Sequence, residues 1–287
     1  MPRFVLTIQS HVAFGFVGNS AAVFPLQLRG FTPIVINTVE FSNHTGHPQT
    51  RGQVFTAEMI EEVIEGVREL GVLPKCEGLL SGYLGDAGIG KVVLHLAEEI
   101  KRANPNAIWL CDPVMGDTDS GVFVRPGIPE FMKAHFLNGL ADITTPNQFE
   151  LELLLGRPVV SRQDAVEAAR NLFIEKGCKV VFVTSLLTKD VPQGFIETLA
   201  VTADKAWTVR TPFISQKAVP NGQGDVFAAS SFGIYLNTHS AKAALEGAVS
   251  TLYGLVSAAP DNDLDLPLID AQKEILTPSS IFKAEEI

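Results

Sequence analysis

The segment from Asn221 to Asp225 carries the residue types and spacing in this chain that best suit chemistry. Gly222 and Gly224 alternate with polar residues, so the backbone can turn tightly and present its N–H groups. The apolar residues that follow recur with helical spacing, which predicts a helix over residues 224–238. The free N–H groups and the positive dipole end of such a helix attract anions. Asp225 would then cap the helix, or take a proton from a hydroxyl held beside a bound phosphate; the motif alone leaves both hypotheses open.

Each predicted strand of the chain is followed by polar or turn-forming residues. In a parallel α/β sheet, ligands bind outside the carboxyl ends of the strands, so these residues are expected to converge on one site. Strand ends are often polar for trivial reasons, and it is the agreement among the ends that favours a common site. The segments are Ser10-His11, Asn37, Asn43–His47, Ser81–Gly85, Asp112–Asp117, Thr145–Asn147 and Thr184-Ser185.

Acidic residues at two of these strand ends are candidate ligands of Mg²⁺. Asn147 and Glu150 are three residues apart, so they share one face of a helix. A carboxylate and an amide there could hold the ion through its retained waters. The same pair also fits a capping box at a helix N-terminus, and for the pair alone that simpler interpretation is favoured. Asp112 ends a buried run before Pro113, where it either aligns a metal or a phosphate or opens a turn.

Two loops also have alternative interpretations. The glycine-bounded segment 116–127 is either a mobile flap over a phosphate-bearing ligand or a solvated surface loop. His44 and His47, beside Asn43, suggest a metal site, but no third ligand follows at a familiar spacing. A polar substrate-binding loop is therefore the preferred interpretation of this second segment.

The composition restricts the class of protein. The chain has 287 residues, of which 46% are hydrophobic and 19% charged, as in globular proteins. Its 22 Lys and Arg against 32 Asp and Glu give a net charge of −10, which argues against nucleic-acid and acidic-membrane binding. Neither a signal peptide nor a membrane span is expected. Cys76, Cys111 and Cys178 form no C-x-x-C pair, which predicts no disulfide framework or structural zinc site and favours a cytoplasmic location.

Short apolar runs alternate with amphipathic stretches, which predicts an α/β fold with a mostly parallel sheet covered by helices on both faces. Two later strands, 195–202 and 206–211, predict an antiparallel hairpin at one edge. No linker or repeat interrupts the pattern, so a single domain is expected over residues 1–287. The other predicted strands cover 4–9, 32–37, 78–81, 108–112, 141–145 and 180–184. The other predicted helices cover 19–29, 57–70, 86–103, 128–137, 148–155, 162–175, 241–258 and 268–276.

Taken together, these motifs resemble the pyridoxal kinases of the ribokinase-like superfamily, in their bacterial branch, over essentially the full chain. The Gly-x-Gly-Asp motif is widespread among sugar and vitamin kinases, and its combination with Ser-Gly-Tyr-Leu-Gly and the Asn-His-Thr loop is specific to vitamin B6 kinases. The resemblance implies a ribokinase-like fold and ATP-dependent phosphorylation of the 5′-hydroxymethyl group of pyridoxal, giving pyridoxal 5′-phosphate and ADP. The matching pieces are Ser10-His11-Val12, Gly18–Ala22, Asn37–Val39, Phe41–Thr45, Ser81–Gly85, Cys111–Gly116, Pro146-Asn147, Glu150–Glu152, Val201–Ala203 and Gly222–Asp225.

The resemblance also implies roles for individual residues. Asp225 resembles the base that takes the proton of the 5′-hydroxyl. Asp112 and Glu150 resemble the acidic end of the Mg-ATP site, with the metal held through water, and a monovalent cation such as K⁺ and a homodimer are further expectations. The backbone N–H groups implied to form an anion hole for the phosphoryl group belong to Gly222, Gln223 and Gly224. The residues implied to contact the substrate are Ser10, Thr45, Gly46, Tyr83 and Asp225, and those implied to border the nucleotide are Thr145, Thr184, Arg210, Thr211, Pro212 and Phe213.

Two positions depart from the family pattern, and two rival functions stay open. Thr184 stands where some relatives carry lysine, so a cationic contact to phosphate is missing or comes from elsewhere. Gln223 stands where a small or β-branched residue is commoner, which leaves the contribution of its side chain open. One rival is a hydroxymethylpyrimidine kinase, which shares the fold and the Gly-x-Gly-Asp motif. The other is a non-catalytic carrier of pyridoxal phosphate. Tyr83 and the loop 43–47 favour pyridoxal as the substrate.

Overall fold

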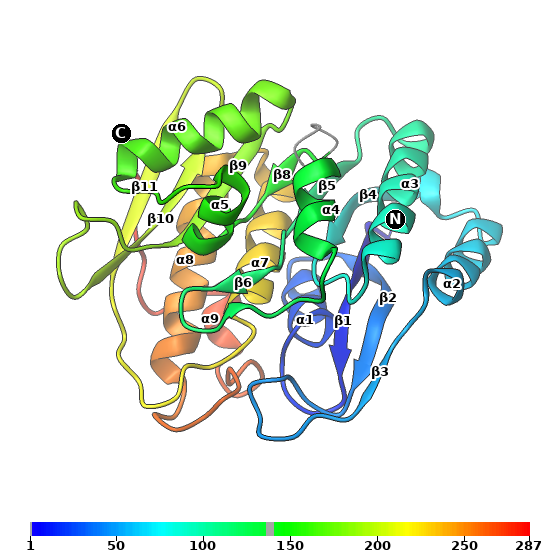
Figure 1. Ribbon diagram of the computed structural model, residues 1–287, viewed down its shortest axis with the longest axis horizontal. Coiled ribbons are helices and arrows are strands. Elements are labelled where there is room, and N and C mark those ends of the chain that lie inside the picture. The colour runs from blue at the N-terminus through cyan, green and yellow to red at the C-terminus, as the bar shows by residue number, and fades with distance from the viewer. Residues whose placement is uncertain (1, 136–140) are drawn as a thin grey trace.

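The computed structural model describes residues 2–135 and 141–287, and its main feature is one ten-stranded sheet (Figure 1). The strands of this sheet are β1 (Phe4–Val12), β2 (Thr32–Phe41), β3 (Gly52–Val54), β4 (Cys76–Ser81), β5 (Ile108–Cys111), β8 (Ile143–Thr144), β9 (Val180–Leu186), β10 (Phe195–Val201), β11 (Ala206–Pro212) and β12 (Glu285–Glu286). Their order is β12-β11-β10-β9-β8-β5-β4-β1-β2-β3. The six strands from β9 to β2 pair in parallel. The others add antiparallel at the two edges. The predicted mostly parallel sheet with an antiparallel edge hairpin is therefore confirmed.

Helices cover both faces of the sheet, as predicted (Figure 1). One face carries α2 (Ala57–Glu69), α3 (Ala87–Ala103), α4 (Ile128–His135), α5 (Gln148–Leu155) and α6 (Arg162–Leu172). The opposite face carries α1 (Asn19–Leu28), α7 (Gln223–Thr238) and α8 (Ala241–Ala258), with α9 (Lys273–Leu276) beside α1 and α8. None of the helices in the described parts of the chain has the length and apolar character that a membrane span requires.

The central strands are apolar on both sides because each side faces a layer of helices. Leu79 and Trp109 pack on the side of α2–α6, whereas Leu80 and Leu110 pack on the side of α1, α7 and α8. This two-sided burial explains why these strands appear in the sequence as nearly continuous apolar runs instead of alternating ones.

Several boundaries differ from the prediction. β2 continues to Phe41, where β3 pairs antiparallel with its end, and β1 continues to Val12 by pairing with this extended part of β2. β3 itself is too short to be predicted. The predicted helix 162–175 ends at Leu172 and is followed by a 3₁₀ turn over Ile174–Lys176. The predicted helix 268–276 shrinks to α9. The predicted end of the helix 128–137 lies outside the described residues.

The position of α7 on the sheet depends on a glycine in β4. A Cβ at Gly78 would lie 2.5 Å from Cζ of Phe232 and 2.9 Å from the carbonyl oxygen of Ile108. The buried Phe232 ring of α7 therefore packs directly on the strand backbone. This close approach places the N-terminus of α7 near the carboxyl ends of the central strands, where the predicted site residues lie.

Gly78→Ala is expected to lower the free energy of unfolding by roughly 1–3 kcal/mol, because the added methyl group overpacks the contact with Phe232. Gly66→Ala in α2 is the matched control, since a Cβ there would have no described atom within 4 Å apart from its chain neighbours and the backbone of its own helix. The control should raise stability by roughly 0.5–1 kcal/mol through helix propensity. Denaturant unfolding of both variants measures the two changes. Equal effects of the two substitutions would contradict the packing argument.

Candidate active site

The N-terminus of α7 is shaped to receive an anion. Gly222 precedes the helix with φ of 83°, and in the described residues no side chain caps this end. A Cβ at Gly222 would lie 1.9 Å from the carbonyl oxygen of Phe16, so only glycine fits this position. The side chain of Gln223 donates its Nε2 to the carbonyl of Pro220 at 2.9 Å and is directed back to the backbone. The first-turn N–H groups, which have no intrahelical partners, are thus the polar groups that this helix end offers a ligand.

Asp225 lies in the first turn of α7 and is half-buried. Burial raises its pKa to about 6, although the N–H of Gly18 donates a hydrogen bond to the carboxylate and opposes this shift. Gly18 in turn lies against Ser10, since a Cβ at Gly18 would fall 2.3 Å from the Ser10 hydroxyl oxygen. A carboxyl group with a pKa close to neutral suits general-base catalysis. Asp225 therefore has both the position and the pKa that suit a proton acceptor.

Asp112 follows β5 and faces the same helix end. Its Oδ1 accepts a hydrogen bond from Oγ1 of Thr145 at 2.9 Å, and its Oδ2 lies 3.9 Å from the Cβ position of Gly224. Burial, and then the negative charge of Asp225, raise the pKa of Asp112 to about 7. Two carboxyl groups and a hydroxyl from three different elements therefore converge beside the α7 N-terminus, and a cation there would stabilise the ionised acids.

Glu150 forms the capping box that the sequence predicted as the simpler interpretation. The Asn147 side chain accepts from the Glu150 N–H, and Oε2 of Glu150 accepts from the Asn147 N–H at 3.0 Å. Oε1 accepts from the N–H of Met115 at 2.8 Å. Burial and the charge of Asp112 raise the pKa of Glu150. Because both oxygens already accept N–H bonds, this carboxylate suits a water-mediated contact to a metal better than a direct one.

The predicted substrate loop lies against the segment that precedes α7. Thr45 and Gly46 are exposed, and a Cβ at Gly46 would lie 2.8 Å from Nδ2 of Asn221. Tyr83 is half-buried, and burial raises its pKa while the positive charge of Arg125 opposes this shift. Arg125 belongs to the segment 116–127, whose strands β6 (Gly116–Asp117) and β7 (Gly121–Val122) pair as a small antiparallel hairpin.

The residues predicted to border a nucleotide lie in two places. Thr184 of β9 lies beside the segment that contains Thr145, since its N–H donates to the carbonyl of Pro146 at 3.0 Å and it pairs with Asn147. The other four residues lie at the end of β11 and just after it. Phe213, the last of them, lines an apolar pocket of about 240 Å³ together with Leu187, Thr188, Val191, Pro192, Gln193, Gly194 and Phe195.

Arg210 is already engaged in an ion pair with a buried carboxylate. Its Nε donates to Oε1 of Glu197 at 2.8 Å, and the same carboxylate accepts two hydrogen bonds from Arg162 at 2.7 Å. Glu197 is fully buried, so Arg210 is held at the antiparallel edge of the sheet. A phosphate contact from Arg210 would have to compete with this pair.

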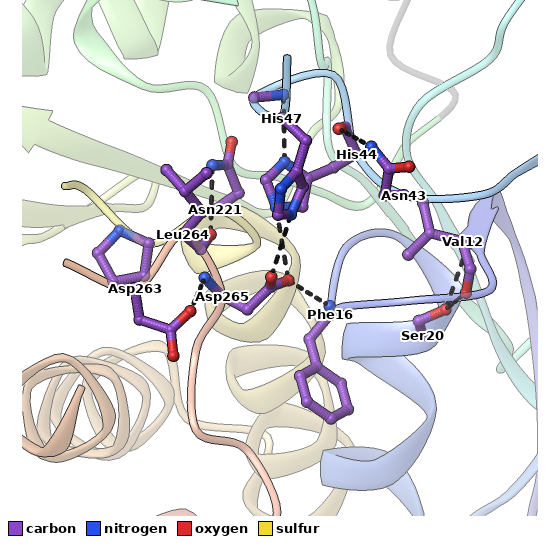
Figure 2. A network of polar contacts seen from close by, with 12 residues as sticks. Val12, Phe16, Ser20, Asn43, His44, His47, Asn221, Asp263, Leu264 and Asp265 are labelled. Carbon is purple, nitrogen blue, oxygen red and sulfur yellow. Dashed lines mark hydrogen bonds and ion pairs between the residues drawn. The ribbon is translucent and has the colours of Figure 1, made fainter. Parts of the chain in front are cut away.

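Asp265 belongs to the neighbourhood of the site and was missed by the sequence analysis. It lies 218 residues after His47, and Figure 2 shows its carboxylate directed at both imidazoles of the loop. Among the described residues, His44, His47 and Asp265 form a group whose potential ligand atoms all lie within 4.8 Å of one another. No local spacing signals such a partner, because it arrives from the other end of the chain.

Comparisons with known proteins give a consistent result. A family model described as phosphomethylpyrimidine kinase matches residues 26–263. A curated pyridoxal kinase PdxY from Deinococcus radiodurans is 43% identical over 291 residues, covering 100% of this chain and 97% of the relative. Another, from Granulibacter bethesdensis, is 41% identical and covers 98% and 99% of the two chains. The solved structure of pyridoxal kinase from Leishmania donovani in complex with ADP and pyridoxamine has a TM-score of 0.90 and 31% identity, covering 99% of each chain.

The raised pKa of Asp112 predicts a specific pH dependence of stability for the ligand-free protein. The unfolded carboxyl ionises near its ordinary value of 3.8, whereas the folded one keeps its proton up to about pH 7. The stabilisation from this group is therefore complete at low pH and is lost as pH rises from about 4 to 7. Asp112→Asn removes the loss, so the variant should exceed the wild type in free energy of unfolding by roughly 2–4 kcal/mol at pH 8.

Denaturant unfolding between pH 3.5 and pH 8 measures this effect, with roughly equal stability of variant and wild type expected only at the acid end, below the pKa of the unfolded carboxyl. Asp204→Asn, which changes an exposed carboxylate, is the matched control and should leave the wild-type profile unchanged. Parallel profiles for Asp112→Asn and the wild type would show that Asp112 does not retain its proton in the folded protein.

Proposed function

Since this chain belongs to the pyridoxal kinase family, we propose that it transfers the γ-phosphoryl group of ATP to the 5′-hydroxymethyl group of pyridoxal, giving pyridoxal 5′-phosphate and ADP. One observation carries the proposal most directly. The Asp225 carboxyl, with a pKa raised to about 6, stands beside the glycine-flanked N-terminus of α7. A proton acceptor and an anion-binding helix end in one place are the two elements that phosphoryl transfer to a hydroxyl requires.

The proposed reaction uses these groups in distinct roles. Asp225 accepts the proton of the substrate hydroxyl as the new O–P bond forms. The N–H groups of residues 222–224 stabilise the charge of the transferred phosphoryl group. Positioning and electrostatic stabilisation supply most of the catalysis in such reactions. The residues proposed to hold the pyridine ring are Ser10, Thr45, Gly46 and Tyr83. Ser10 lies against Gly18, which donates to Asp225, and Gly46 lies against Asn221, just before α7.

We propose that Asp112 and Glu150 hold Mg²⁺ through water. The ion would neutralise phosphate charge when bound. The support for it is the burial of two neighbouring acids, which raises the pKa of both. The need for a cation to neutralise phosphate charge is greater in this chain, because Thr184 provides no positive charge and Arg210 is paired with Glu197. A monovalent cation such as K⁺ is a further proposal, which rests on the family alone.

We propose that the nucleotide extends from Thr145 and Thr184 toward the edge of the sheet. The apolar pocket beside Phe213 and Leu187 offers a surface for the base, and Thr211 and Pro212 would flank it. Arg210 would then serve mainly to hold this edge in place through Glu197. The family also supports a homodimer, and the three free, buried cysteines suit a cytoplasmic location. The participation of all long strands in one sheet supports a single domain over residues 1–287.

Asp225→Asn should reduce kcat by about 10²–10⁴-fold, because the amide cannot accept the hydroxyl proton, while ATP binding is retained. ADP release with Mg-ATP measures the change, tested separately with pyridoxal and with hydroxymethylpyrimidine, since the matching family model is described as a phosphomethylpyrimidine kinase. Preference for the pyrimidine would change the substrate and keep the mechanism. Tight binding of pyridoxal 5′-phosphate without ADP release from either compound would indicate a carrier.

The wild-type kcat/KM for pyridoxal should fall as pH drops below about 6, because the free Asp225 carboxyl becomes protonated there. The base must be ionised to act, so the activity is lost on the acid side of its pKa. Initial rates across pH 5–8 measure this limb. A profile that stays flat to pH 5 would exclude Asp225, with its raised pKa, as the group that controls activity.

A further inference from the structure

We propose that Asp265 is a positioning residue that orients the substrate-binding loop through His44 and His47, an inference that rests on the proposed function of that loop. Asp265 lies in the segment between α8 and α9 and is 13% exposed. Its Oδ1 lies 3.4 Å from Nε2 of His44, and its Oδ2 lies 3.3 Å from Nε2 of His47 (Figure 2). One carboxylate thus contacts both histidines of the loop.

The protonation state of His44 follows from its other contact. The N–H of Gly46 donates to Nδ1 of His44 at 3.2 Å, so a neutral imidazole must carry its proton on Nε2. Burial lowers the pKa of His44, which favours this neutral form, although the charge of Asp265 opposes the shift. The Nε2 proton faces Asp265 at a distance that makes the contact mainly electrostatic. A series of polar contacts therefore runs from the Gly46 N–H through the His44 imidazole to Asp265, and it fixes the orientation of the Gly46 peptide group.

The same carboxylate connects the loop to the α7 N-terminus. Oδ1 of Asp265 accepts the N–H of Phe16 at 3.1 Å, and the carbonyl of Phe16 is the atom against which Gly222 packs. Gly15 leaves room for the carboxylate, since a Cβ there would lie 2.1 Å from Oδ1. Asp265 also pairs with Asn221 through the backbone. The substrate loop, the turn before α1 and the segment before α7 are therefore joined at one residue.

A divalent metal ion is the alternative occupant of this cluster, because the three side chains offer ligand atoms within 4.8 Å of one another. One contact of His44 argues against it. Nδ1 of His44 already accepts the Gly46 N–H, so Nε2 could bind a metal only if the imidazole lost its single proton or the Gly46 contact broke. Metal-bound histidines usually donate their other ring N–H instead. These contacts therefore fit a His44 that carries its proton on Nε2, beside the Asp265 carboxylate, better than they fit a metal site.

The test is Asp265→Asn, which keeps the shape of the side chain and removes its charge. We expect the KM for pyridoxal to rise about tenfold, because the loop loses its orientation, while the KM for ATP changes by less than about twofold. Hydrogen exchange of the amides in residues 43–50 should become faster in the ligand-free variant. Asp270→Asn is the matched control, since it changes an exposed carboxylate of the same segment and should leave all three quantities unchanged.

A double-mutant cycle with His47→Gln separates positioning from a general loss of structure. The effects of Asp265→Asn and His47→Gln on the pyridoxal KM should be less than additive, because each removes the same contact. Additive effects, equal rises in both KM values, or an unchanged loop exchange rate would overturn the proposal. So would stoichiometric binding of Zn²⁺ by the wild type that Asp265→Asn abolishes. If the wild type does not phosphorylate pyridoxal, the proposed function fails, and the exchange and pyridoxal-binding measurements still decide the role of Asp265.

Discussion

The close approach of two backbones, at Gly222 and Phe16, is the constraint on which the site depends. The carbonyl of Phe16 occupies the space that a Cβ at Gly222 would need, so the turn before α1 lies directly against the start of α7. This contact brings the N–H of Gly18 to Asp225 and leaves the first turn of α7 beside Asp112, which follows β5. Further along α7, Gly78 of β4 leaves room for the Phe232 ring, so that α7 packs directly on the sheet. Two glycines thus fix the position of α7 against the turn before α1 and against the central sheet.

The acidic side chains of the site are held in a state that favours ligands. Burial raises the pKa of Asp112, Glu150 and Asp225, so the ligand-free protein keeps ionisable groups in an unfavourable environment. A bound cation and the phosphates it accompanies would relieve this destabilisation. A local positive charge is more important in this chain, because its net charge is −10 and position 184 is a threonine, which carries no charge. Under the proposed function, lower stability of the free protein and tighter binding of a metal–nucleotide complex would be two consequences of one arrangement.

The antiparallel additions at the two sheet edges have different tasks. At one edge, the pairing of β2 with β3 lengthens the strands and carries the histidine-containing loop across to Asn221 and Asp265. At the other edge, β10 and β11 bring Arg210 to the buried Glu197, where Arg162 of α6 completes the ion pair. The first addition shapes the proposed pyridoxal site. The second stiffens the wall beside the apolar pocket at Phe213.

The sequence alone determined the features that depend on local periodicity and short spacing. The apolar runs predicted the parallel strands, the glycine-flanked motif at Gly222–Asp225 predicted the start of α7, and Asn147 with Glu150 predicted the capping box. Only the tertiary structure decided which distant residues meet. Asp265 approaches His47 from 218 residues away, and β3 forms because an existing strand accepts it. The reason is physical: hydrogen-bond ladders and helix faces repeat within a few residues, whereas a single ionic or packing contact between remote segments leaves no periodic trace in the sequence.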